Sequence, residues 1–208
     1  MNVVTKVFYD LSGSRYASAS VEDITHRDPM SDYPNNKCGA EYIERYGSEW
    51  KNPTVGFCKG RLSLLFNGKK LYVRRMEGEN TGYPAVSGKA EAGQNGEWVF
   101  DYSASRQDDR DTGPIPAGLY WIKPSELWEN AWYKPGSEEA WGTHRITIHP
   151  YRSTDTFCRG GFFIHGGSVP GSAGCIDLTK NMAHFVKDIK ASIGEDTKCK
   201  IELTVEYT

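Results

Sequence analysis

The chain has 208 residues, a length that suits one domain of ordinary size or one domain with a smaller appendage. Its 25 basic and 27 acidic side chains leave a formal net charge of −2, which argues against a nucleic-acid-binding or membrane-surface protein. It has no apolar run of about 18 residues, so no membrane span is predicted. The 22 glycines, 12 tyrosines and 6 tryptophans favour a turn-rich β protein over a helical bundle.

Residues 1–59 form an N-terminal extension whose role the pattern does not reveal. Residues 3–9 are compatible with a strand, residues 12–37 are rich in loop-forming side chains, and residues 40–46 are compatible with one or two helical turns. The first ten residues lack the charged start, apolar centre and cleavage site of a signal peptide. Regular patterning begins at Arg61, and residues 60–208 are therefore interpreted as the main domain.

The first half of this domain predicts short strands joined by turns. Residues 62–66 and 71–76 flank Asn67-Gly68, a pair typical of a type I′ hairpin turn. Further strands are expected around residues 85–87, at 98–102 and, after the rigid turn of residues 113–118, at 119–122. Residues 123–141 contain three tryptophans among prolines, glycines and acidic side chains. We interpret this stretch as an excursion that covers a site.

The second half alternates more regularly. Residues 144–149 form a strand that places Ile146 and Ile148 on one face and Arg145, Thr147 and His149 on the other. Residues 162–165 form the next strand. The period then changes, because four apolar residues follow helical spacing and predict a helix from about Thr179 to Gly194: Met182, Phe185, Val186 and Ile189. A last strand covers residues 199–207. The fold class is therefore mainly β (a β-rich α+β fold), mostly antiparallel, with one clear helix.

Five cysteines are present, at positions 38, 58, 158, 175 and 199. Cys38 and Cys58 are candidates for a disulfide in an oxidising compartment, although spacing alone does not fix the pairing. Cys199 lies in the alternating pattern of the last strand and is expected to be packed. The cysteine and histidine spacing does not match a zinc site, and we predict no metal and no cofactor.

The most informative stretch runs from His165 to Cys175. A short apolar strand ends at His165, and a loop with glycines at 166, 167, 171 and 174 leads to Cys175. Thiol catalysis needs a nucleophile, a base within hydrogen-bond reach and backbone N–H groups that can face an oxyanion. The glycines allow the tight loop that would bring the thiol to the imidazole. A buried structural cysteine with an unrelated histidine is the alternative interpretation.

These residues resemble the YkuD-type L,D-transpeptidases. The resemblance lies in Ile164-His165-Gly166 and in Ser172-Ala173-Gly174-Cys175-Ile176, with weaker matches at residues 113–118 and 144–150. It is closest to the small L,D-transpeptidase-like effectors of type VI secretion. It covers residues 60–208, which would form a YkuD-like antiparallel β-sandwich or barrel with a helix after the catalytic cysteine. Residues 1–59 lie outside it.

The resemblance implies an enzyme that acts on peptidoglycan stem peptides. Cys175 would be the nucleophile and His165 its base, and the carbonyl of Gly166 would orient the imidazole. Gly174 and Cys175 would supply the oxyanion hole, while Ser172 would brace the loop. A thiolate–imidazolium pair would lower the pKa of the cysteine. Arg145 would hold a stem carboxylate, and His149, Gly167 and Ser168 would contact substrate.

The sequence departs from the family pattern at two positions. Ala173 stands where a histidine usually precedes the Gly-Cys pair, and Asp177 stands where an arginine usually follows the cysteine. We therefore expect trimming of tetrapeptide stems by an L,D-carboxypeptidase, or D-amino-acid exchange, rather than cross-linking. Asp177 is expected to cap the following helix, and His184 is expected at the surface. His26 lies in a loop and carries no signal.

Alternatives remain at this point. They are a housekeeping L,D-transpeptidase, a papain-like or NlpC/P60-type peptidase, and a non-catalytic peptidoglycan-binding module. The peptidase is disfavoured because His165 precedes Cys175 here, whereas the cysteine comes first in those enzymes. A substrate in the periplasm and the lack of a signal peptide pattern favour an injected antibacterial effector. Its expected partners are a secretion apparatus and a cognate immunity protein.

Overall fold

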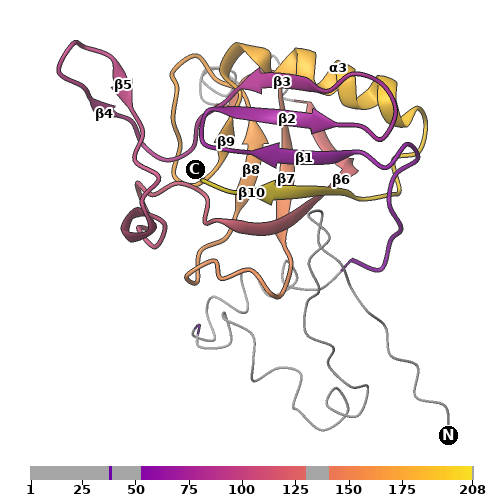
Figure 1. Cartoon of the computed structure of the whole chain (residues 1–208), viewed down its shortest axis with the longest axis horizontal. Coiled ribbons are helices and arrows are strands. Elements are labelled where there is room, and N and C mark those ends of the chain that lie inside the picture. Colours follow the sequence, from indigo (N-terminus) through magenta and orange to yellow (C-terminus); the bar gives the residue numbers. More distant parts are fainter. Residues whose placement is uncertain (1–37, 39–52, 130–140, 208) are drawn as a thin grey trace, which may run out of the picture.

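The computed structural model describes residue 38, residues 53–129 and residues 141–207. The strand expected at residues 3–9, the helical turns expected at 40–46 and the middle of the 123–141 excursion lie outside the described residues. The described part is mostly β, with a curled sheet and one α-helix (Figure 1). This agrees with the β-rich α+β class predicted from composition and periodicity.

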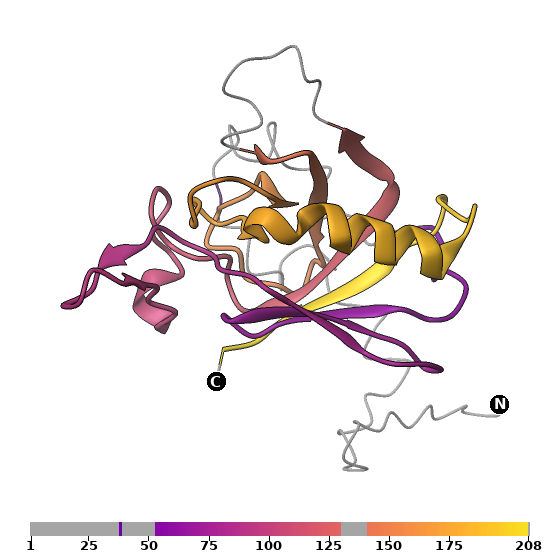
Figure 2. The same cartoon turned by 90° about the horizontal axis from the view of Figure 1, so that it is seen from above.

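One curled sheet of eight strands dominates the described part, and its spatial order is β3-β2-β1-β10-β6-β7-β8-β9. Neighbouring strands are antiparallel except for the pairs β1–β10 and β8–β9, which are parallel. A separate hairpin of β4 and β5 projects from the body (Figures 1 and 2). The strands are β1 Ser63–Phe66, β2 Lys70–Arg74, β3 Thr81–Pro84, β4 Glu91–Ala92, β5 Trp98–Val99, β6 Gly118–Glu129, β7 His144–Pro150, β8 Phe162–His165, β9 Ile176–Asp177 and β10 Ile201–Val205.

Helix α3 (Met182–Ile193) lies across one face of this sheet (Figure 2). Its apolar stripe is the one that helical spacing predicts, and all four predicted residues are buried. The short 3₁₀ turn η4 (Thr179–Asn181) precedes it, and Gly194 ends it at a φ of 60° with its N–H bonded to the Lys190 carbonyl. A second 3₁₀ turn, η3, covers Ala104–Arg106. The helix and the inward face of β7, which carries Ile146 and Ile148, contribute to one apolar core.

Several boundaries differ from the sequence prediction. The turn after β1 is not type I′, because Gly68 has a positive φ of 85° but Asn67 does not. Instead the Asn67 side chain accepts the backbone N–H groups of Lys69 and Lys70, which makes a longer loop. Residues 85–87 contribute only a bridge from Val86 to Asp177.

The strand expected at residues 98–102 stops at Val99, so it is shorter than the alternation suggests. The strand expected at residues 119–122 continues to Glu129 as β6 and takes in the start of the expected excursion. A register shift between Ile122 and Leu127 interrupts its pairing with β7. Such irregularities bend a strand.

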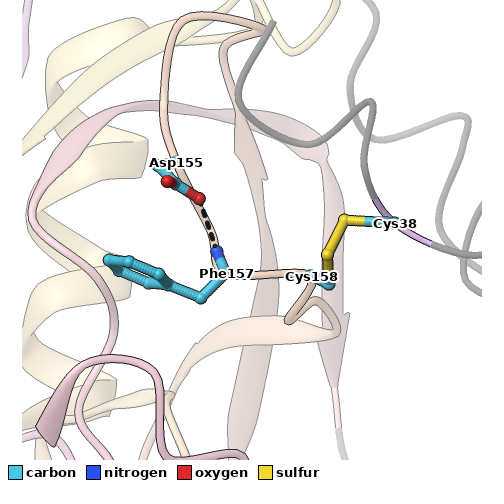
Figure 3. The surroundings of a disulfide bond; sticks show 4 residues. All are labelled: Cys38, Asp155, Phe157 and Cys158. Atoms are coloured by element: carbon cyan, nitrogen blue, oxygen red, sulfur yellow. Dashed lines mark hydrogen bonds between the residues drawn. A yellow bond between two sulfur atoms is a disulfide. The ribbon is translucent and has the colours of Figure 1, made fainter.

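Two disulfides replace the expected Cys38–Cys58 pair. Cys38 is bonded to Cys158, and Cys58 is bonded to Cys199. The prediction was wrong because the pairing depends on which segments the fold places together. A short parallel bridge pairs Phe57 with Lys200, and the neighbouring residues Cys58 and Cys199 are bonded to each other. Figure 3 shows the Cys38–Cys158 disulfide beside a tight turn in which Asp155 accepts the N–H of Phe157. Within the described residues, no helix is long and apolar enough to cross a membrane.

Candidate active site

His165 is the last residue of β8 and is almost completely buried, with 4% of its surface exposed. Its Nδ1 lies 2.5 Å from the carbonyl oxygen of Gly166. A carbonyl oxygen only accepts hydrogen bonds, so Nδ1 must carry the proton, and Nε2 of the neutral ring is left with its lone pair. Gly166 is needed at this point because a Cβ there would lie 2.7 Å from the carbonyl oxygen of Thr179.

Cys175 immediately precedes β9, and it is the free cysteine of the structure. The parallel register pairs Ile164 with Ile176 and His165 with Asp177, which places Cys175 level with Phe163. Side chains two residues apart on a strand share a face, so the register places the thiol and the imidazole on the same side of β8 and β9. The Sγ lies 4.0 Å from the Gly161 carbonyl oxygen.

The electrostatics of the thiol differ from the expected low-pKa thiolate. Burial raises the pKa of Cys175 to about 12, and the nearby carboxylate of Asp177 acts in the same direction. The charges of Arg159 and Arg145 and a hydrogen bond from the Phe163 backbone oppose this rise. The thiol is therefore neutral at physiological pH in this structure. The expectation of a lowered pKa rested on the imidazole alone and left out the cost of desolvating the sulfur.

The loop between the two residues is anchored near Cys175 by Ser172. The hydroxyl of Ser172 donates to the Cys175 carbonyl oxygen at 2.7 Å, and the Ser172 N–H donates to the Gly88 carbonyl. Gly174 has a φ of 95°, a conformation that favours glycine. Gly167 is half-buried and Ser168 is exposed at the outer end of the loop. The middle of the loop, at Ser168, therefore faces solvent, and its last residues adjoin the thiol.

Asp177 is fully buried and bridges two segments. One carboxylate oxygen accepts the N–H of Thr179 at 2.7 Å, and the other accepts the N–H of Gly171 at 3.0 Å. The expected cap of the following helix is not formed by Asp177: the N-cap residue of η4 is Leu178 and that of α3 is Asn181, and Asp177 only accepts the N–H of the first residue of η4. Desolvation raises the pKa of Asp177, while these hydrogen bonds and the nearby His165 act to lower it. The carboxylate ties the loop after His165 to the start of the helical region.

Arg145 lies beside His165 in the register of β7 and β8. Its guanidinium carbon is 5.1 Å from the ring centre of Trp141 and 5.5 Å from that of Phe163, and Trp128 lies at 5.6 Å. The Trp141 ring also meets the His165 ring edge-on, with 5.2 Å between centroids. Within the described part of the chain, the buried Nε of Arg145 has no hydrogen-bond partner. A cation among aromatic rings therefore adjoins the imidazole.

His149 is positioned differently. Its ring stacks on Trp121 with 4.3 Å between centroids, and its Nε2 lies 2.5 Å from a carboxylate oxygen of Glu126. Both partners belong to β6, so the imidazole is engaged on the β6 side of β7, four residues along the strand from Arg145. The structure does not bring His149 and His165 together. His184 lies exposed on α3, as its position in the helical pattern predicts.

Arg159 is a residue that the sequence analysis missed. Its side chain is 3% exposed, and its guanidinium donates to the backbone carbonyls of Gln107, Gly113 and Pro114 at 2.6–2.9 Å. A Cβ on Gly174 would lie 2.6 Å from its Nη2. A lone arginine between a cysteine and two glycines has no periodicity. The turn at 113–118, which Arg159 supports, is the one signal that could have drawn attention to it.

The arrangement is suited to acyl transfer. It combines a thiol, a histidine whose tautomer is fixed by a carbonyl, a glycine-rich turn at the thiol and a neighbouring arginine. In the described residues, no group of three or more histidine, cysteine, aspartate or glutamate side chains is placed to hold a metal ion.

Comparison with known families shows a match to the Tlde1 domain. The model of this family matches residues 92–200, just over half of the chain. The matched range includes His165 and Cys175 and ends immediately before the last strand. A search of curated proteins finds no match.

Proposed function

The chain belongs to the Tlde1 domain family of type VI secretion effectors, and from this premise we propose that it is a cysteine enzyme acting on the tetrapeptide stems of peptidoglycan. The proposed reaction removes or exchanges the terminal D-alanine, as an L,D-carboxypeptidase or by L,D-transpeptidase exchange. The effector family also implies a secretion system and a cognate immunity protein as partners. We place the reaction in the periplasm of a target cell.

The observation that carries the proposal is the state of His165. Its Nδ1 donates to the Gly166 carbonyl, which leaves Nε2 as the base. In the first step the Cys175 sulfur attacks the carbonyl carbon between the third residue of the stem and D-alanine, and its proton passes to Nε2. The oxyanion is stabilised by the N–H groups of Gly174 and Cys175. The C–N bond then breaks, and the imidazolium returns the proton to the departing amine.

The second step resolves the thioester. Water attacks it in the carboxypeptidase reaction, and the amine of a free D-amino acid attacks it in the exchange reaction. In each case His165 takes a proton from the attacking group and the sulfur leaves as the thiol. Ser172 keeps the loop in place through its bond to the Cys175 carbonyl, so the oxyanion donors stay fixed between the two steps.

The raised pKa of Cys175 defines how the first step proceeds. A thiol with a pKa of about 12 holds almost no thiolate at neutral pH. Proton transfer to His165 and attack on the carbonyl are therefore expected to occur together once substrate is bound, as in serine hydrolases, rather than from a preformed ion pair. The same burial favours the alternative of a non-catalytic peptidoglycan-binding module, which the experiment below separates.

Substrate orientation is assigned to Arg145. The carboxylate of the terminal D-alanine would meet its guanidinium, because the Nε is buried without a partner in the described part and aromatic rings flank the cation. Gly167 and Ser168 lie in the loop whose tip faces solvent and would contact the stem. His149 is hydrogen-bonded to Glu126, and we propose that it contacts substrate only at the edge of the surface formed by Arg145, Gly167 and Ser168.

The test is a digest of purified disaccharide-tetrapeptide followed by mass spectrometry, with a free D-amino acid added in a parallel tube. Wild-type protein is compared with Cys175→Ala, His165→Ala and the control His184→Ala, which removes an exposed histidine. Loss or exchange of D-alanine with wild type and the control, and a fall of at least about 10³-fold with the other two, is the expected result. No change in any tube would refute the enzyme and favour the binding module.

A further inference from the structure

The buried guanidinium of Arg159 lies against the backbone that carries the nucleophile. Three backbone carbonyls, those of Gln107, Gly113 and Pro114, accept its N–H groups. The guanidinium also lies 5.6 Å from the Phe162 ring centre. These contacts hold the cation in one position between the 113–118 turn and the start of β8.

Gly174 is the point at which this cation meets the candidate site. A Cβ built on Gly174 would lie 2.6 Å from Nη2 of Arg159 and 2.9 Å from Cε1 of Phe162. The guanidinium therefore packs against the side of Gly174 on which a Cβ would stand, one residue before Cys175. Removal of this side chain would leave a space beside Gly174, whose N–H is assigned to the oxyanion hole.

Burying a charged group is costly, since an ion removed from water loses several kcal/mol of hydration free energy that hydrogen bonds and other charges must offset. Desolvation lowers the pKa of Arg159, while Tyr120, Asp109, Tyr207 and Cys175 act in the opposite direction. Buried charges placed beside a reactive group are candidates for a functional role.

We propose that Arg159 is a positioning residue for Cys175: it fixes the Gly174–Cys175 backbone and supplies a positive charge that favours the ionised sulfur. This inference rests on the proposed function, in which Cys175 is the nucleophile. Among the described residues, the other charged or titratable groups around the thiol are Asp177 on β9, Arg145 on β7 and His165 on β8. Asp177 opposes the effect and Arg145 adds to it.

The experiment measures alkylation of Cys175 in the full chain with its disulfides intact. The neutral reagent iodoacetamide and the anionic reagent iodoacetate are used at several pH values between about 7 and 10. Below the thiol pKa, the rate falls tenfold for each unit by which the pKa rises. Wild type is compared with Arg159→Met, which removes the charge, Arg159→Lys, which keeps it, and Arg75→Met. Arg75 is also largely buried but pairs with Asp188 of α3, so it serves as the control.

We expect Arg159→Met to react with iodoacetamide at least about threefold more slowly than wild type at each pH, with a larger loss for iodoacetate, because the local positive charge no longer attracts the anion. Arg159→Lys should stay within about twofold of wild type, and Arg75→Met should be unchanged. A merely structural role predicts the opposite sign, since a loosened loop exposes the thiol and speeds alkylation. Equal or faster reaction of Arg159→Met would overturn the proposal.

The experiment also covers an unfolded Arg159→Met variant and a wild type without enzyme activity. If circular dichroism shows that Arg159→Met is unfolded, the decision passes to the ratio of iodoacetate to iodoacetamide rates in Arg159→Lys. A ratio close to wild type supports the charge role, and a ratio equal to that of the unfolded chain overturns it. The tetrapeptide digest is run on the same samples. A wild type that alkylates as expected but leaves the tetrapeptide intact refutes the enzyme while the test of Arg159 still stands.

Discussion

Replacing Gly174 by alanine tests the packing at the base of the candidate site. The residue has a φ of 95°, and the left-handed region costs a residue with a Cβ about 1–2 kcal/mol. The new methyl group would also lie 2.6 Å from Arg159 and 2.9 Å from Phe162, an overpacking that costs about 1–3 kcal/mol. We therefore expect Gly174→Ala to lower the free energy of unfolding by about 2–5 kcal/mol.

Gly194→Ala is the matched control. Gly194 also has a positive φ, of 60°, but among the described residues no atom outside its immediate chain neighbours lies within 4 Å of the place that a Cβ would occupy. Its backbone has a ψ of −131°, a combination that glycine adopts far more readily than other residues, so its substitution should cost only the conformational part, about 1–3 kcal/mol. The assay is urea denaturation of both variants and wild type, followed by tryptophan fluorescence and circular dichroism. Equal losses in the two variants would refute the reasoning, because the contact of Gly174 with Arg159 and Phe162 would then carry no cost.

Three other changes have expected outcomes. Replacing both Cys58 and Cys199 by alanine removes a cross-link between residues 141 positions apart and should lower stability by about 2–5 kcal/mol, measured by urea denaturation. Hydrogen bonds within its own turn lower the pKa of Asp109. The ionised carboxylate therefore adds to the free energy of unfolding above its unfolded pKa of about 3.9, and this stabilisation is lost as pH falls through the lower folded pKa. The stability difference between wild type and Asp109→Asn should shrink as pH falls from about 6 to about 3. Phe185→Ala removes a 2%-exposed ring from the core and should cost about 3–5 kcal/mol in thermal or urea unfolding.

Prediction from sequence succeeded best where one period runs over many residues. The apolar stripe of α3 and the alternation of β7 were recognised because each element buries one face against the same core. A buried face requires apolar residues at the period of the helix or strand, and this period can be read from the sequence. Gly194 was recognised as the helix end because a glycine readily takes the positive φ required there. Short strands such as β5 were less predictable, since two paired residues leave no period to read.

The candidate site was predictable only in part. His165 and Cys175 were proposed from the glycine-rich loop between them, and the register of β8 and β9 brings their segments together, while their catalytic roles stay a prediction. Arg159 was missed because its partners are backbone carbonyls of a turn some 45–52 positions earlier in the chain, and backbone partners leave no trace in residue identity. The disulfide pairing was wrong for a related reason, since spatial neighbours set it and sequence spacing does not.

The place of β10 in the sheet has a consequence for how the protein is made. This strand follows all the other described strands in the chain, yet it lies in the interior of the sheet, parallel to β1 on one side and antiparallel to β6 on the other. Until residues 201–205 leave the ribosome, β1 to β3 and β6 to β9 have no strand to join them. Native pairing of the whole sheet must therefore wait until this strand has been synthesised. A nascent chain of the proposed toxin thus lacks the centre of its sheet until residues 201–205 have been made.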